Sequence, residues 1–166
     1  MSYAAVFTIA LTALAAAGIT LSAGPAQANP GPATTNQHLS SDELLAQYPA
    51  FASEYARYQP SADALAQMQQ LQGLQLVVLY GSWCHDSERE VPRLLKLLQQ
   101  SNVALSSLQL APVNQQKQHP QQLHSQYNLK YTPTIIVLDN GRELGRIIET
   151  PAKSLAEDLA EIAAKR

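Results

Sequence analysis

The chain has 166 residues, a formal net charge of −2 and a pI near 6.0. This length suits one domain with a substantial core, and the near-neutral charge gives no reason to expect nucleic acid as a partner. A single cysteine, Cys84, excludes an internal disulfide.

Residues 4–23 are apolar and rich in alanine, and the sequence GPAQANP follows, in which Ala26 and Ala28 have the A-x-A spacing of a cleavage site. We therefore predict a signal peptide over residues 1–28 and export to the periplasm of a bacterial host. A retained membrane anchor is the alternative, because the apolar run is nearly long enough to span a bilayer. Export would take Cys84 into an oxidising compartment.

Residues 29–40 are polar and contain Pro and Gly, which predicts a flexible linker. Ser40 and Glu43 have the spacing of a capping box and predict the start of a helix. Short helices are expected over residues 41–72, where two prolines interrupt the pattern. This segment is predicted to be an N-terminal helical extension.

Residues 73–166 alternate between strand and helix patterns, in the order β-α-β-α-β-β-α. The order predicts an α/β fold with a central mixed four-stranded sheet flanked by helices. The first part is expected to form parallel βαβ units, and the Asp-Asn-Gly turn at 139–141 to make a hairpin that adds an antiparallel edge. The expected strands are 74–80, 105–113, 134–138 and 143–148, and the expected helices are 84–100, 120–127 and the segment after Ser154.

Three features of this region coincide. Trp83 and Cys84 stand between a buried strand and a helix, Pro92 follows eight residues after Cys84, and Thr132-Pro133 precedes the third strand. In these features the chain resembles the thioredoxin superfamily.

The resemblance covers about residues 74–164. It implies a thioredoxin-like fold over residues 73–166, in which Pro133 is the cis-proline and lies beside the cysteine. It also implies thiol- or disulfide-containing proteins, or glutathione, as partners. No cofactor and no metal are expected.

Two positions depart from the family pattern. Enzymes of the family normally carry a second cysteine where this chain has Ser87, and many carry a buried aspartate where it has Val78. A two-cysteine enzyme resolves its mixed disulfide with the second cysteine. Serine cannot do this, so glutathione, a second substrate cysteine or a partner protein must release whatever Cys84 captures.

The unpaired amides at the start of a helix favour a thiolate there. We therefore predict Cys84 as the nucleophile and Ser87 as a hydrogen-bond donor to its sulfur. Glu149 is hypothesised to shape the groove or relay protons, with an exposed acid at a strand end as the alternative. The predicted substrate groove consists of Trp83, His85, Thr132, Pro133 and Glu149.

The predicted function is therefore monothiol thiol–disulfide exchange, although whether the chain is an enzyme stays open at this point. The alternative is a non-catalytic thioredoxin-fold binding or chaperone-like module. A peroxide sensor that passes through sulfenic acid and copper ligation by Cys84 and His85 are further readings. His119 and His124 are expected to be surface residues.

Overall fold

The computed structural model describes residues 40–166. The predicted signal peptide and residues 29–39 of the predicted linker lie outside the described residues, and the predicted boundary at residue 73 stays a prediction. Among residues 40–166, no helix is long and apolar enough to cross a membrane. The elements are α1 (Ser41–Gln47), α2 (Pro49–Arg57), α3 (Ala62–Met68), the 3-10 turn η1 (Gln69–Leu71), β1 (Gln75–Tyr80), α4 (His85–Ser101), β2 (Ser107–Pro112), α5 (Leu123–Gln126), β3 (Thr134–Asp139), β4 (Arg142–Ile148) and α6 (Leu155–Ala163).

The four strands form one mixed sheet in the order β2-β1-β3-β4. β1 pairs in parallel with β2, where Val78 is opposite Leu110. β3 pairs antiparallel with β1 and with β4. The predicted four-stranded mixed sheet flanked by helices is thus confirmed. The expectation of parallel βαβ units holds for β1-α4-β2 and is wrong for β3.

The direction of β3 follows from the segment between β2 and β3. This segment stays at the end of the sheet where β1 ends. At the start of the segment, the Val113 carbonyl accepts a hydrogen bond from Trp83 Nε1, 3.4 Å away. Near its end, Thr132 contacts Cys84. A parallel strand would need a crossover that returns to the opposite end of the sheet. Because the segment contains only the four-residue α5 and does not return, β3 must run back antiparallel to β1.

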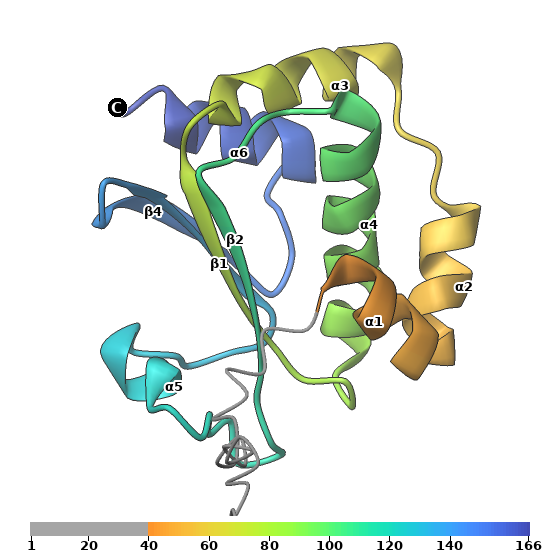
Figure 1. Cartoon of the computed structure of the whole chain (residues 1–166), viewed down its shortest axis with the longest axis vertical. Coiled ribbons are helices and arrows are strands. Elements are labelled where there is room, and N and C mark those ends of the chain that lie inside the picture. The colour runs from red at the N-terminus through yellow and green to blue at the C-terminus, as the bar shows by residue number, and fades with distance from the viewer. Residues whose placement is uncertain (1–39) are drawn as a thin grey trace, which may run out of the picture. The chain divides into compact units, whose positions relative to one another are not determined.

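Two apolar cores cover the two faces of the sheet, because side chains alternate along each strand. One core contains Val78 and Tyr80 of β1 together with buried residues of α1, α3, α4 and α6. The other contains Val77 and Leu79 with Leu123 of α5. Figure 1 shows the sheet nearly edge-on, with α4 and α6 on one side and α5 on the other.

The N-terminal helices form a further layer over α4 (Figure 1). The predicted start of α1 is confirmed: the Ser40 hydroxyl accepts from the Glu43 amide at 3.3 Å, and the Glu43 carboxylate accepts from the Ser40 amide at 2.8 Å. Pro49 occupies the first turn of α2, where its missing N–H costs nothing. Leu44 and Phe51 are fully buried, so these helices complete the core on this side.

Candidate active site around Cys84

Cys84 lies in the short turn that joins β1 to α4. Its amide donates to the Gly81 carbonyl at 2.9 Å, which closes the turn, and its own carbonyl accepts the Glu88 amide at 2.9 Å, which starts the helix. Cys84 is therefore the N-cap residue of α4. Its side chain is half-buried, and the thiol donates to the Thr132 carbonyl with 3.0 Å between sulfur and oxygen.

Thr132 and Pro133 are buried and precede β3 directly, and the peptide bond between them is cis. The antiparallel pairing of β3 with β1 brings this corner beside the end of β1, from which Cys84 follows. The structure therefore brings together Cys84, Thr132 and Pro133, residues separated by about fifty positions in the sequence.

Ser87 is fully buried one turn into α4. Its hydroxyl oxygen accepts the Gly81 amide at 3.3 Å, so it ties the first turn of the helix back to the end of β1. The hydroxyl hydrogen is not used in that bond, and its predicted donation to the Cys84 sulfur stays a prediction.

The indole of Trp83 lies over Gly81, and the residue is 40% exposed. The indole Nε1–H donates to the Val113 carbonyl at 3.4 Å. A Cβ at position 81 would lie 2.6 Å from Cε2 of the indole, closer than carbon atoms pack. Gly81 is therefore required for the indole to occupy its place beside Cys84. The sequence offers no reason to select Gly81, because no local pattern predicts its contact with the Trp83 indole.

Substituting Gly81 with alanine is expected to displace the indole. Because Trp83 is the only tryptophan of the chain, its fluorescence emission should shift and its quenching by iodide should increase. The fold should persist, because the clash involves one partly exposed side chain. Gly141→Ala is a poor control since Gly141 has a φ of 82°; Ala152→Ser, far along the chain and exposed, serves better. An unchanged emission spectrum in Gly81→Ala would contradict the packing.

Glu149 follows β4 with a positive φ of 59°, and its amide donates to the Pro133 carbonyl at 2.8 Å. The backbone of this residue thus contacts the cis-proline corner, as the hypothesis about Glu149 required. Its side chain is exposed, which fits the alternative of a solvated acid at a strand end. A role in proton relay stays a prediction.

His85 is the first residue of α4. Its imidazole is 88% exposed and lies 3.7 Å from the Glu88 carboxylate on the next turn of α4. Its predicted place in the substrate groove is untested by these contacts. The prediction that His119 lies at the surface is wrong: His119 is buried, and its ring Nδ1 accepts the Gln121 amide at 3.1 Å within the loop. His124 is half-buried, and its Nδ1 accepts the His119 amide at 2.9 Å.

The large apolar side chains that remain exposed belong to sequence neighbours of site residues. Within residues 40–166 they are Trp83, Tyr131 and Ile148. Each is a direct sequence neighbour of a site residue, namely Cys84, Thr132 and Glu149. Sequence reasoning missed Tyr131 and Ile148, because exposure of an apolar residue cannot be predicted from a pattern of mostly buried strands.

No group of three or more His, Cys, Asp or Glu side chains that could hold a metal ion occurs in the described part of the chain.

Comparison with known proteins identifies the class. A model of the thioredoxin family, described as thioredoxin, matches residues 36–162, so the chain belongs to the thioredoxin family. Membership indicates thiol–disulfide redox chemistry in general, and proteins of this fold generally act on thiol or disulfide substrates.

Several solved structures are similar to this chain. Trxlp of Edwardsiella tarda EIB202 is 24% identical, covers 63% of this chain and 95% of its own, and has a TM-score of 0.42. A protein of unknown function from Pseudomonas aeruginosa is 20% identical, covers 77% of this chain and 78% of its own, and has a TM-score of 0.49. The reduced thioredoxin pre-protein of Schistosoma mansoni is 16% identical, with coverages of 65% and 93% and a TM-score of 0.39. A search of curated proteins found no match.

Proposed function

We propose that this chain is an exported monothiol thiol–disulfide exchange protein in which Cys84 is the nucleophile and an outside thiol completes each cycle. The observation that carries the proposal is the position of Cys84. Its half-buried sulfur lies at the start of α4 beside Thr132 and cis-Pro133, and a buried serine, Ser87, stands three residues further on.

The chemistry has two balanced steps. The Cys84 thiolate attacks one sulfur of a substrate disulfide; a new S–S bond forms to Cys84, the old S–S bond breaks, and the second substrate sulfur leaves as a thiolate that takes up a proton. The outside thiolate then attacks the substrate sulfur of the mixed disulfide. This step restores the Cys84 thiolate and carries the substrate away as a disulfide with the outside thiol.

Export is supported by the sequence of residues 1–28, whose apolar run and A-x-A pattern resemble a signal peptide. In an oxidising compartment an unpaired thiol meets disulfides and small oxidised thiols. A periplasmic location therefore supplies the substrates that a single-cysteine protein needs. Mass measurement of the protein isolated from its own cells should give a chain that begins at Asn29, and a chain that retains residues 1–28 would contradict cleavage.

The reactivity of Cys84 tests the proposal. At pH 7 the full chain should react with iodoacetamide about tenfold faster than free cysteine, which is mostly protonated at that pH. The protein isolated from its own compartment should also carry a glutathione or protein adduct on Cys84, which Cys84→Ala must lack. Slow alkylation together with an unmodified thiol would overturn the proposal.

A binding or chaperone-like module is the second candidate. The exposed Trp83, Tyr131 and Ile148 favour it, since three apolar side chains at one site can hold an unfolded peptide without any exchange. The two functions separate cleanly in the Cys84→Ala variant. A binding module should retain its affinity for a reduced, unfolded polypeptide in that variant, whereas an exchange protein should lose its covalent adducts.

A further inference from the structure

An open cavity of about 280 Å³ lies beside the first turn of α4, between this helix and α2. It is separate from the corner that holds the Cys84 sulfur, although His85, which lines it, directly follows Cys84 in the chain. The polar residues that line it are Ser53, Glu54 and Arg57 of α2 and His85, Glu88 and Arg89 of α4. The cavity therefore opens next to the proposed nucleophile.

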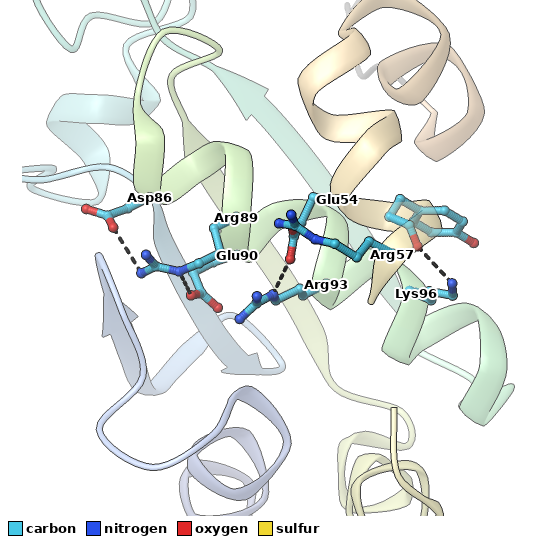
Figure 2. A network of polar contacts seen from close by, with 8 residues as sticks. Glu54, Arg57, Asp86, Arg89, Glu90, Arg93 and Lys96 are labelled. Atoms are coloured by element: carbon cyan, nitrogen blue, oxygen red, sulfur yellow. Dashed lines mark hydrogen bonds and ion pairs between the residues drawn. The ribbon is translucent and has the colours of Figure 1, made fainter. Parts of the chain in front are cut away.

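The cavity owes its shape to the way α2 is held on α4. Arg93 Nε donates to the Glu54 carboxylate at 2.6 Å, and three residues later Lys96 Nζ donates to the Tyr55 carbonyl at 2.8 Å (Figure 2). Contacts advance in the same direction along both helices, so α2 and α4 run parallel. The cavity lies along α2, from Ala50 to Arg57, and beside the first turns of α4, at His85, Glu88 and Arg89.

Glu54 is buried and shared by two guanidinium groups, those of Arg93 and Arg57. Burial favours the neutral acid and is the largest single effect on this carboxyl, but the hydrogen bonds and charges of Arg93 and Arg57 together outweigh it and hold the pKa of Glu54 below its ordinary value. The Arg57 side chain is 77% exposed and that of Arg93 is 31% exposed. Arg57 can therefore turn to a ligand while Arg93 keeps Glu54 paired.

Arg89 supplies a second guanidinium to the cavity. It is fixed between two carboxylates of its own helix, Glu90 at 2.6 Å and Asp86 at 3.0 Å (Figure 2). These hydrogen bonds and charges raise the pKa of Arg89, that with Glu90 being the largest effect, so the group is a permanent cation. Its Nε and Nη2 already donate to these carboxylates, so Arg89 offers its remaining N–H groups, in a fixed orientation, to a further carboxylate.

The remaining polar groups complement an ammonium group. Glu88 is paired within the cavity only with the exposed His85, 3.7 Å away, and Ser53 adds a hydroxyl. Guanidinium groups together with a carboxylate and a hydroxyl match a zwitterion, such as the end of a peptide that carries both an α-carboxylate and an α-ammonium group. At about 280 Å³ the cavity is just below the usual ligand range of about 300–1,000 Å³, so it suits one end of such a molecule.

We infer that this cavity binds the zwitterionic, carboxylate-bearing end of a small peptide thiol of the glutathione class, and that this thiol releases the mixed disulfide on Cys84. The inference rests on the proposed function, which requires an outside thiol because Ser87 cannot resolve the intermediate. Because a tripeptide spans up to about 10 Å when extended, a molecule bound by one end beside His85 is long enough for its thiol to approach the preceding residue, Cys84. The thiolate attacks the captured sulfur, the bond to Cys84 breaks, and Cys84 leaves as the thiolate.

Release kinetics test the inference. The full chain is first converted to its mixed disulfide with a cysteine-containing peptide. The return of the unmodified chain is then followed by mass spectrometry with glutathione or with glutathione dimethyl ester, which has the same thiol and no free carboxylate. In the wild-type protein glutathione should react at least about tenfold faster, and its rate should saturate with concentration. In Arg57→Gln the ratio of the two rates should fall about tenfold, whereas Arg57→Lys should retain part of it.

Arg142→Gln is the matched control, since Arg142 is an exposed arginine on β4. It should leave both rates unchanged. Ser53→Glu, which adds an anion to the cavity without removing a partner of Glu54, should lower the glutathione rate as Arg57→Gln does. Equal rates for glutathione and its dimethyl ester in the wild-type protein would refute the proposed binding in the cavity. They would not contradict the proposed exchange function.

Binding without chemistry separates the two ideas further. S-methylglutathione has no thiol, so its NMR titration reports on the cavity alone, and the amide signals of Ser53 and His85 should shift with a saturable dependence that Arg57→Gln weakens. If these shifts occur while no thiol frees Cys84 from its mixed disulfide, binding in the cavity is supported and the proposed function fails. If they are absent, the inference fails whatever the reactivity of Cys84.

Discussion

Replacing Ser87 with cysteine is expected to let the protein release its own mixed disulfides. Ser87 is buried on the first turn of α4, and residues three apart on a helix lie on the same face. Their Cα separation there falls within the range that a disulfide spans. A thiol at position 87 would therefore attack the Cys84 sulfur and expel the captured group, as the second cysteine does in two-cysteine members of the family.

The stoichiometry of reaction with 5,5′-dithiobis(2-nitrobenzoate) measures this change. The wild-type protein should release one thionitrobenzoate per chain and retain the other on Cys84. Ser87→Cys should release two and end as an internal disulfide, with a mass two hydrogen atoms below that of the reduced variant. Ser87→Ala, which has no thiol at position 87 and loses the hydrogen bond from the Gly81 amide, should release one equivalent, as the wild type does. One equivalent from Ser87→Cys would show that position 87 cannot reach Cys84.

Truncating Phe51 to alanine is expected to destabilise the whole domain by about 3–5 kcal/mol, the cost of removing a buried aromatic ring from a core. Phe51 of α2 is fully buried, and its ring centroid lies 5.5 Å from that of Tyr48 and 5.8 Å from that of Tyr80. Tyr80 ends β1 directly before the turn that holds Cys84. The loss should appear as a lower midpoint in urea, followed by circular dichroism, with a single transition.

Tyr80→Phe is the control for this prediction. Burial raises the pKa of the Tyr80 phenol, and its hydroxyl has no hydrogen-bond partner within residues 40–166. Its removal therefore breaks no bond and should not destabilise the protein. A Phe51→Ala variant as stable as the wild type, or one in which the N-terminal helices unfold in a separate first transition, would contradict the view that α2 belongs to the same cooperative core.

Much of the fold could be predicted from local patterns. The nearly continuous apolar run that became β1 predicted a strand buried on both faces, and the Ser40–Glu43 pair predicted where α1 begins. The turn at residues 139–141 predicted the β3–β4 hairpin. Each of these depends on neighbours within a few residues, so the sequence carries them directly.

The direction of β3 could not be predicted in this way. It is decided by where the segment between β2 and β3 leaves and rejoins the sheet, and thus by contacts such as that of Trp83 with Val113. The environment of His119 also depends on how the loop folds, since its ring nitrogen accepts a hydrogen bond from a backbone amide of the same loop. A histidine in a polar stretch gives no sign that the loop will fold around it.

For the site, sequence reasoning selected Cys84, Thr132 and Pro133, which the structure brings together at one corner. It did not select Gly81, Tyr131 or Arg57. Gly81 contributes because an indole packs closely on it, and Tyr131 because it is exposed. Arg57 contributes because it shares the Glu54 carboxylate with an arginine of α4. Such properties exist only once distant segments are in place.

The layer of N-terminal helices over α4 also constrains how the protein can be divided. A fragment that began at β1 would bare the side of α4 on which Phe51 and Leu44 are buried, and Lys96 would lose the carbonyls of Tyr55 and Ala56 to which it donates. The apolar strip so exposed would invite self-association. We therefore expect a fragment that begins at β1 to be less stable and less soluble than the chain that keeps the N-terminal helices.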